Sequence, residues 1–382
     1  MIFFKNFING LKKLFLTFKN FFYLFNNSFE TVFFSESKFY QKYFYSFIKI
    51  ISENNKKIIY LHSQLDDQIN LPNVRNIYIG EGFFLKLCFR IIKANNFFMT
   101  LIDLGNHSLK KSKYVKKYIY IFHGVNSTHK TYTENAFDNY DVIFCPGKVH
   151  KNEIITAENL RNIKKKKIIE IGYFYFDYLI SKSKIKENKT ILIATSWNYS
   201  KQNFTNNNLI ELLNNCLKLN EYNFIFLPHP EQLKRDSETI SRIEKQFEKN
   251  KNFKINKSFD NSSLLEKSIL LITDNSGIAI EYMLIYKRPT IYFNKFSKIH
   301  NKNFSQISNY TLEDEIKEKF GYLVKNPNFK NITIYINEAV KEMKRKEHLI
   351  NDFVSDNFYN FGTASLAAYN CIYVENLEKK KN

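Results

Sequence analysis

The sequence predicts an α/β protein with two doubly wound parallel sheets. Short runs rich in Ile, Leu, Val, Phe and Tyr recur along most of the chain. These runs are almost continuously apolar, which is typical of strands buried on both faces of a parallel sheet. Stretches with helical periodicity separate them, and a regular alternation of strands and helices predicts doubly wound α/β units.

The predicted elements fall into two groups of comparable size. In the first half, predicted strands cover residues 57–62, 97–102, 118–122, 141–145 and 168–171. In the second half, they cover residues 190–194, 223–227, 269–272 and 290–293. The clearest predicted helices, all in the second half, cover residues 207–219, 237–250 and 277–286.

A polar segment at residues 181–189 separates the two groups and has no apolar periodicity. We interpret it as the hinge between two Rossmann-like domains, residues 46–180 and 190–350, that face each other across a cleft. Residues 1–45 are predicted to form a separate amphipathic segment. Residues 351–382 are predicted to form a helix that packs back toward the first domain.

Composition narrows the function classes without choosing one. The chain has 382 residues, with 57 Lys and Arg against 37 Asp and Glu, and a net charge of +20. A hydrophobic content of 44% excludes a disordered chain. The four cysteines form no CxxC motif, which excludes a disulfide scaffold and predicts no structural zinc site. The dispersed lysines are compatible with nucleic acid, an anionic membrane or a phosphorylated substrate.

Residues 1–25 have the pattern of a basic amphipathic helix. One face carries Lys5, Lys12, Lys13 and Lys19, and the opposite face carries Phe, Leu and Ile. The lysines recur too often for a membrane-spanning helix, and the segment lacks the apolar core and cleavage site of a signal peptide. Two interpretations remain, a helix docked on the protein's own core and a helix on an anionic membrane surface. The positive-only polar face favours the membrane.

Three predicted strand ends carry side chains suited to chemistry. The first is followed by His123, Gly124 and Lys130, the second by His229 and Pro230, and the third by Thr273, Asp274, Asn275, Ser276 and Gly277, with Glu281 one turn into the next helix. Ligands of doubly wound sheets bind beyond these carboxyl ends. A histidine there either serves as a proton acceptor or caps a loop. The third turn either only caps its helix or also binds phosphate at the helix N-terminus.

These blocks, in this order, resemble the CDP-glycerol glycerophosphotransferase family, which includes the teichoic-acid primases and polymerases. Further stretches agree, namely Gly172-Tyr173 with Asp177, residues 192–197, and the tail Phe361-Gly362-Thr363-Ala364-Ser365. The resemblance covers roughly residues 115–370. Departures occur at Gly277, where the family has a second Ser, at residues 174–176 before Asp177, and at Val125-Asn126 after the His-Gly pair.

The resemblance implies a GT-B fold, with an acceptor domain at residues 46–180 and a nucleotide-donor domain at residues 190–350. It implies a transferase that moves a glycerol-phosphate or related polyol-phosphate unit from a CDP-activated donor to a polymer or lipid-linked acceptor. His123 would then be the general base and His229 would stabilise the diphosphate leaving group. Gly124, Lys130, Pro230, residues 273–277 and Glu281 would bind substrate, Glu281 through the ribose. No metal and no cofactor are predicted.

Two alternatives stay open. The Thr-Asp-Asn-Ser-Gly turn with Glu281 also resembles nucleotide-sugar enzymes such as UDP-N-acetylglucosamine 2-epimerases, so a GT-B glycosyltransferase for capsule or lipopolysaccharide is the main alternative. A basic nucleic-acid-binding protein is more distant, because no recognition motif is present and arginines are scarce. With the amphipathic N-terminus, the favoured hypothesis predicts a peripheral protein at the cytoplasmic face of the cell membrane, with no nucleic-acid partner.

Overall fold

The computed structural model describes residues 2–106, 109–183, 187–197, 204, 208–258, 260–293 and 299–375, without the side chains of residues 2–9, 11 and 12. The chain divides into two compact units. Unit 1 comprises Met1–His123, Tyr132–Tyr178 and Phe358–Asn382, and unit 2 comprises Gly124–Thr131 and Leu179–Asn357. The predicted hinge at 181–189 begins just after the boundary, although residues 184–186 lie outside the described residues.

Unit 1 contains a seven-stranded parallel sheet in the order β3-β2-β1-β4-β5-β6-β7. Its strands are β1 (Phe29–Ser35), β2 (Ile58–His62), β3 (Val74–Tyr78), β4 (Ala94–Met99), β5 (Val115–Ile121), β6 (Val142–Cys145) and β7 (Lys167–Glu170). Its helices are α1 (Ile2–Asn26), α2 (Lys38–Gln41), α3 (Tyr45–Glu53), α4 (Gly82–Ile91), α6 (Lys148–Leu160), α16 (Ala364–Tyr369) and the π-helix η3 (Asn370–Val374). Helix α7 (Phe174–Lys182) spans the boundary between the units.

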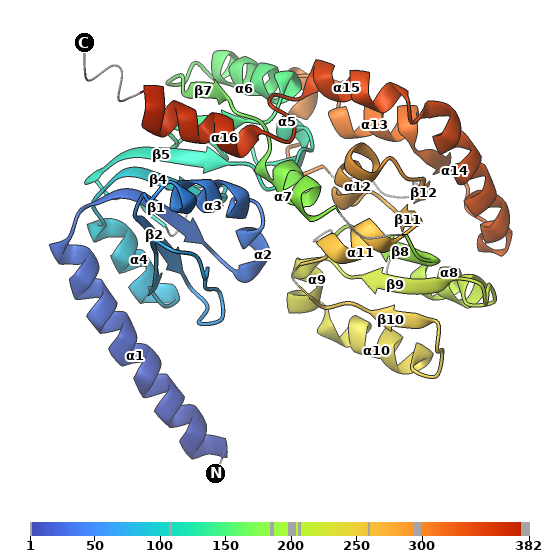
Figure 1. The fold of residues 1–382 in the computed structure, drawn as a ribbon, viewed down its shortest axis with the longest axis horizontal. Coiled ribbons are helices and arrows are strands. Elements are labelled where there is room, and N and C mark those ends of the chain that lie inside the picture. Colours follow the sequence, from blue (N-terminus) through green and yellow to red (C-terminus); the bar gives the residue numbers. More distant parts are fainter. Residues whose placement is uncertain are drawn as a thin grey trace. The chain divides into compact units, whose positions relative to one another are not determined.

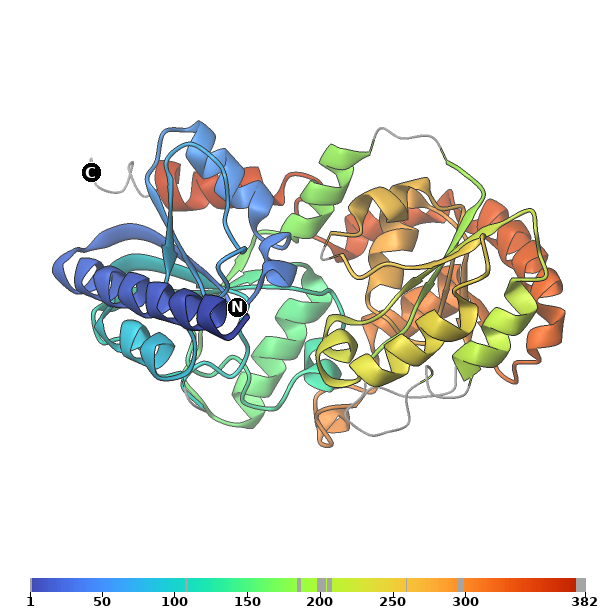
Figure 2. The same cartoon turned by 90° about the horizontal axis from the view of Figure 1, so that it is seen from below.

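Unit 2 contains a six-stranded parallel sheet in the order β10-β9-β8-β11-β12-β13. Its strands are β8 (Thr190–Ala194), β9 (Asn223–Leu227), β10 (Phe253–Ile255), β11 (Leu270–Thr273), β12 (Thr290–Phe293) and β13 (Tyr322–Val324). Its helices are α5 (Thr128–Thr131), α8 (Asn208–Cys216), α9 (Pro230–Arg235), α10 (Ser237–Phe247), α11 (Ser262–Lys267), α12 (Ile278–Tyr286), α13 (Leu312–Phe320), α14 (Ile332–Lys346) and α15 (Leu349–Asn357), with short 3₁₀ turns η1 (Phe304–Gln306) and η2 (Phe329–Asn331). Figures 1 and 2 show how the elements of each unit follow the chain.

The predicted α/β class with two parallel, doubly wound sheets is confirmed. Strand order reverses between β1 and β4 in unit 1 and between β8 and β11 in unit 2, and a doubly wound sheet binds ligands at such a switch point. The central strands are buried along their whole length, as their continuous apolar sequences require, for example in β2 and β8.

Strand β1 lies inside the segment predicted as amphipathic, residues 1–45. It pairs with both β2 and β4, and five of its seven residues are buried. The sheet of unit 1 therefore begins at Phe29. The polar residues Asn26, Asn27 and Ser28 separate the aromatic run of α1 from β1. Helix α1 alone corresponds to the amphipathic part of that segment.

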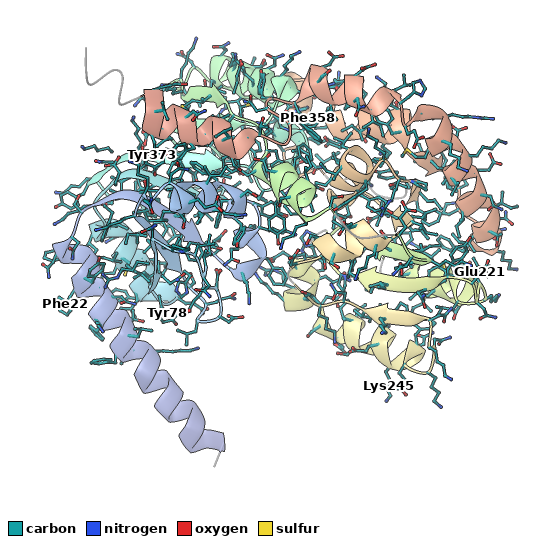
Figure 3. The ribbon with its side chains drawn as sticks, in the orientation of Figure 1. Phe22, Tyr78, Glu221, Lys245, Phe358 and Tyr373 are labelled. Carbon is teal, nitrogen blue, oxygen red and sulfur yellow. The ribbon has the colours of Figure 1, made fainter. Side chains whose placement is uncertain are left out.

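The chain returns to unit 1 at Phe358, so only the later part of the predicted segment 351–382 packs there, and residues 351–357 belong to unit 2. The carboxylate of Asp177 accepts hydrogen bonds from the backbone N–H groups of Ala364 (3.2 Å) and Ser365 (2.7 Å) at the start of α16. Gly172 has a φ of +101°, and an added Cβ would lie 2.3 Å from the Tyr359 carbonyl oxygen. Gly172 and Asp177 thus hold the C-terminal segment against the rest of unit 1. Figure 3 labels Phe358 and Tyr373 in that segment.

Helix α1 lies beside α4 (Figures 1 and 2). It docks on unit 1 through the side that carries Thr17, Asn20 and Leu24. Thr17 and Leu24 are buried, and the Asn20 amide donates a hydrogen bond to the Tyr78 carbonyl oxygen at 2.7 Å. The opposite side leaves Phe15 73% and Phe22 58% exposed. Phe22 is labelled in Figure 3. The side chains of Lys5 and Lys12, part of the predicted cationic face, lie outside the described residues.

Asp67 is fully buried beyond the carboxyl end of β2. Its Oδ1 accepts hydrogen bonds from the Tyr60 hydroxyl (2.7 Å) and the Gln41 amide (3.2 Å). Burial raises the pKa of Asp67 from 3.8 to about 6. Because the folded-state pKa is higher than the unfolded one, this carboxyl favours folding most at low pH. That contribution is lost as the pH rises through about 6.

We therefore expect Asp67→Asn, which keeps an oxygen acceptor but cannot ionise, to stabilise the protein at pH 7.5 by roughly 2–3 kcal/mol. At pH 4, where the carboxyl is protonated, the variant and the wild type should unfold at similar denaturant concentrations. Urea unfolding at both pH values measures the difference. An equal effect at the two pH values would contradict the raised pKa.

Candidate active site

The turn that follows β11 is held by the buried side chain of Asp274. Its Oδ1 accepts hydrogen bonds from the backbone N–H of Ser196 (2.7 Å) and of Asn275 (2.6 Å), and its Oδ2 accepts one from the Ser196 hydroxyl (2.7 Å). Burial raises the pKa of Asp274, and these hydrogen bonds act against the rise. Asp274, predicted to bind substrate, thus ties the carboxyl ends of β8 and β11 together at the switch point of unit 2.

The same turn begins α12 and aims its N-terminus toward the carboxyl edge of the sheet. Thr273 is buried, and its hydroxyl accepts a hydrogen bond from the Ser276 backbone N–H at 3.2 Å. Gly277 is the N-cap of the helix. The Ala279 and Ile280 N–H groups already donate to the Ser276 and Gly277 carbonyl oxygens, which leaves the Gly277 and Ile278 N–H groups at the positive end of the helix dipole. This end of α12 is therefore suited to an anionic group such as phosphate.

A cavity of about 660 Å³ lies within unit 2 next to this turn. It is lined by Asn126, Lys130, Thr131, Asn275, Ser276, Ile280, Tyr292, Asn309, Tyr310, Thr311, Glu313, Asp314, Glu315, Lys317, Glu318 and Leu323. Three of the predicted substrate-binding residues, Lys130, Asn275 and Ser276, are brought together here. Gly277 adjoins them as the N-cap of α12.

Two lysines share one carboxylate in this cavity. Asp314 accepts hydrogen bonds from Lys130 (2.9 Å) and Lys317 (2.8 Å), and Lys317 also lies 3.4 Å from the Asn275 amide oxygen. Burial alone would raise the pKa of Asp314, but hydrogen bonds from Lys317, Thr311 and Lys130 hold it well below its usual value. The Asp314 carboxylate therefore stays ionised, and it holds the ammonium groups of Lys130 and Lys317 close to the turn at residues 273–277. Glu313, Glu315 and Glu318, on the same helix as Asp314 and Lys317, also line the cavity and add acidic side chains to it.

The loop that carries Lys130 is anchored to the N-terminus of α13. The Ser127 backbone N–H donates to Glu313 (2.8 Å), and the Ser127 hydroxyl accepts from the Leu312 backbone N–H (2.8 Å). His129 Nε2 hydrogen-bonds with the Ser308 carbonyl oxygen at 3.0 Å. Residues Gly124–Thr131 therefore belong to unit 2, although they follow directly on β5 of unit 1.

His229 is the N-cap of α9, and its Nδ1 accepts a hydrogen bond from the Glu231 backbone N–H at 3.1 Å. An Nδ1 that accepts a hydrogen bond leaves the proton of the neutral imidazole on Nε2. Pro230 occupies the first helical position, where its fixed φ suits the turn. The residue thus acts as a cap and at the same time presents an N–H donor.

His123 lies in unit 1, directly after Phe122 at the end of β5. Its ring is surrounded by the rings of Tyr40, Tyr43 and Tyr132 at centroid distances of 5.5, 6.1 and 5.7 Å. Its Nδ1 lies 3.3 Å from the Tyr120 hydroxyl. If the Nδ1 proton is donated to that oxygen, Nε2 is the acceptor nitrogen of the neutral ring.

Glu281 is buried in α12 and, of the described residues, is not among those that line the cavity. Its charge helps to raise the pKa of Tyr292, for which burial is the main cause. No group of three or more His, Cys, Asp or Glu side chains placed to hold a metal ion is found in the described part of the chain.

Sequence reasoning missed Ser196, Lys317 and Asn126. Ser196 follows a predicted strand end, which was a usable signal. Lys317 has no sequence signal, because it occupies one turn of a surface-like helix among many lysines. Asn126 and Lys317 become site residues only through contacts that are distant in the sequence.

A family model described as CDP-Glycerol:Poly(glycerophosphate) glycerophosphotransferase matches residues 32–368. Among solved structures, the chain is similar to the wall teichoic acid polymerase TagF, with a TM-score of 0.66 and 16% identity over 99% of this chain and 98% of that chain. A TagF structure with a His-to-Asn substitution and CDPG soaked in has a TM-score of 0.60 and 15% identity over 99% and 98% of the two chains.

A UDP-GlcNAc 2-epimerase from Neisseria meningitidis bound to UDP-GlcNAc has a TM-score of 0.54 and 14% identity over 92% of this chain and 100% of that chain. At these identities the structural similarities show a shared fold. The comparison with curated proteins finds no match.

The Asp274 network makes a prediction about stability. Asp274→Ala removes a buried acceptor and leaves three donors without it, so we expect the free energy of unfolding to fall by about 2–4 kcal/mol. Ser196→Ala removes only the hydroxyl donor and should cost about 1 kcal/mol. Urea unfolding of both variants measures the two losses. Equal losses, or none, would show that the carboxylate does not hold the turn.

Proposed function

Because the chain belongs to the CDP-glycerol:poly(glycerophosphate) glycerophosphotransferase family, we propose that it moves a glycerol-phosphate or related polyol-phosphate unit from a CDP-activated donor to a hydroxyl of a cell-surface polymer or lipid-linked acceptor. A chain of this family is a glycerophosphotransferase-like transferase, and the proposal adds the donor, the acceptor class and the residues. The TagF structure soaked with CDPG supports a donor of this kind.

The observation that carries the proposal is the cavity beside the N-terminus of α12. A diphosphate needs several hydrogen-bond donors and positive charge, and Ser276, Lys130 and Lys317 supply these beside the helix dipole. The acidic residues of α13 that line the cavity are suited to accept hydrogen bonds from polyol hydroxyls. The cavity thus offers donors for phosphate and acceptors for a polyol.

In the proposed reaction, the acceptor oxygen attacks the phosphorus of the glycerol-phosphate unit, and the bond from that phosphorus to the CMP oxygen breaks. His123 takes the proton of the acceptor hydroxyl at Nε2, while its Nδ1–H is oriented by the Tyr120 oxygen. The Nε2–H of His229 donates to the CMP phosphate as negative charge develops on it.

The exposed aromatic face of α1 supports a membrane surface as the site of action. This face comprises Leu14, Phe15, Phe18, Phe22 and Phe25, and the neighbouring Phe83 on α4 is 72% exposed. A helix docked on its own core would bury its aromatic side, whereas α1 buries Thr17 and Leu24. Among the described residues, the exposed aromatic face contacts α4 at one edge, where the Phe18 ring lies against the Phe84 ring. Lys13 and Lys19 are exposed on the same helix and complement anionic lipid. None of the described helices is long and apolar enough to cross a bilayer.

For the reaction, we expect purified protein to release CMP from CDP-glycerol in the presence of a lipid acceptor. His123→Ala should lower kcat by about 100-fold or more, because the base is lost. Tyr120→Phe should lower it less and change the pH–rate profile, because the imidazole stays but loses its partner. His348→Ala, at an exposed histidine between α14 and α15, serves as the matched control and should not change the rate.

Release of CMP that is unchanged in His123→Ala would overturn the assignment of the base. Thermal-shift measurements with CDP, UDP and GDP test the alternative of a nucleotide-sugar glycosyltransferase. Selective stabilisation by CDP is expected. Selective stabilisation by UDP would favour the alternative.

For the membrane surface, we expect the wild type to co-sediment with vesicles that contain phosphatidylglycerol and not with vesicles of phosphatidylcholine alone. The double substitution Phe15→Ser and Phe22→Ser should weaken vesicle binding by about tenfold or more. Ile334→Ser with Leu366→Ser, at exposed apolar residues outside α1, is the matched control. Equal binding of both double variants would contradict the role of α1.

A further inference from the structure

Gly277 and Asn126 are far apart in the sequence and meet at the first turn of α12. An added Cβ at Gly277 would lie 2.8 Å from Asn126 Oδ1 and 3.8 Å from its Cγ, and a real Cβ does not approach an oxygen so closely. Gly277 has an ordinary helical φ of −58°, so its backbone conformation does not require glycine. A side chain at position 277 would therefore have to displace the Asn126 amide from its present position.

Asn126 is held in this position by its neighbours. Ser127 is fixed by two hydrogen bonds to the N-terminus of α13, and Lys130 by its ion pair with Asp314. The backbone at Asn126 cannot withdraw from α12 without breaking these contacts. A side chain at position 277 would therefore move the Asn126 amide by rotation of its side chain and not by a shift of the loop.

The Asn126 amide is only partly covered, and it lines the same cavity as Asn275, Ser276 and Lys317. Its Oδ1 faces Gly277, so its Nδ2 is directed elsewhere. A neutral amide N–H₂ beside a helix N-terminus and two ammonium groups is a donor suited to a phosphate oxygen.

We propose that Asn126 is a further donor-binding residue, which hydrogen-bonds a phosphate oxygen of the nucleotide-diphosphate donor at the N-terminus of α12, and that Gly277 lacks a side chain to give this amide its place. The inference rests on the proposed function and adds to it a specificity-determining residue from the loop after His123. The loop then contributes to the donor site at both Asn126 and Lys130.

The decisive substitution is Asn126→Asp, which keeps the volume of the side chain and replaces the amide donor with a negative charge. A carboxylate near a helix N-terminus is favourable, so the melting temperature of the ligand-free protein should stay the same or rise. The same carboxylate would repel phosphate, so the Kd for CDP-glycerol should rise by about tenfold or more. A residue that only filled space would leave the Kd unchanged.

The contact between the two positions is tested by a double-mutant cycle. Gly277→Ser should lower the melting temperature, because its side chain meets the Asn126 amide. Adding Asn126→Ala to Gly277→Ser should restore most of the lost melting temperature. If the two positions were independent, the effects of the single substitutions would simply add. Gly10→Ser is the matched control, because nothing lies within 4 Å of a Cβ at that glycine.

The experiment is calorimetric titration of the full chain with CDP-glycerol, together with thermal unfolding of the same variants. Weak donor binding in Asn126→Asp without loss of stability supports the proposal. If the wild type binds CDP-glycerol and Asn126→Asp binds it equally well, the role of Asn126 is overturned and the proposed function stands. If the wild type does not bind CDP-glycerol, the proposed function itself is overturned, and the role of Asn126 with it.

Discussion

The site of unit 2 depends on the buried carboxylate of Asp274. A doubly wound sheet leaves a gap where its strand order reverses, and the loops on the two sides of that gap must be joined before they can form a binding surface. Asp274 joins them by accepting hydrogen bonds from Ser196 after β8 and from Asn275 at the turn after β11. This placement lets α12 begin at Ile278 with its N-terminus directed at the cavity. Burying one carboxylate thus determines where phosphate is expected to bind.

The chain carries the loop after β5 into unit 2 and so combines parts of both halves of the sequence in one site. Ser127 and Lys130 attach this loop to α13, and Asp314 holds the two lysines at fixed positions. Other family-like stretches have a different purpose. Asp177 and Gly172 fasten the C-terminal helix to unit 1 and contribute stability to the fold. The residues of the family pattern therefore divide into those that line or support the cavity, such as Ser276 and Asp274, and those that stabilise unit 1, such as Gly172 and Asp177.

Much of the fold could be predicted because its central strands are buried on both faces, and burial of that kind produces continuous apolar runs. Strand β1 was not predicted because aromatic residues are abundant in both α1 and β1, although the polar residues Asn26, Asn27 and Ser28 mark the boundary between them. The turn at residues 273–277 was visible because polar residues directly after a buried strand are unusual. Asn126 and Lys317 could not be ranked in the same way, since their importance comes from distances between separate segments, whereas Ser196 directly follows a predicted strand. Asp274 lies at the predicted turn, but its carboxylate accepts hydrogen bonds from Ser196 and Asn275 of the protein itself.

A crystal structure of the protein with CDP-glycerol bound measures where the donor phosphates lie. The phosphates are expected within hydrogen-bond distance of the Gly277 and Ile278 backbone N–H groups at the start of α12, with Lys130 or Lys317 and the Asn126 amide beside them. The polyol hydroxyls are expected against the acidic side chains of α13 that line the cavity. Phosphates located at another edge of the unit 2 sheet, with the turn at residues 273–277 empty, would contradict the assignment of the site.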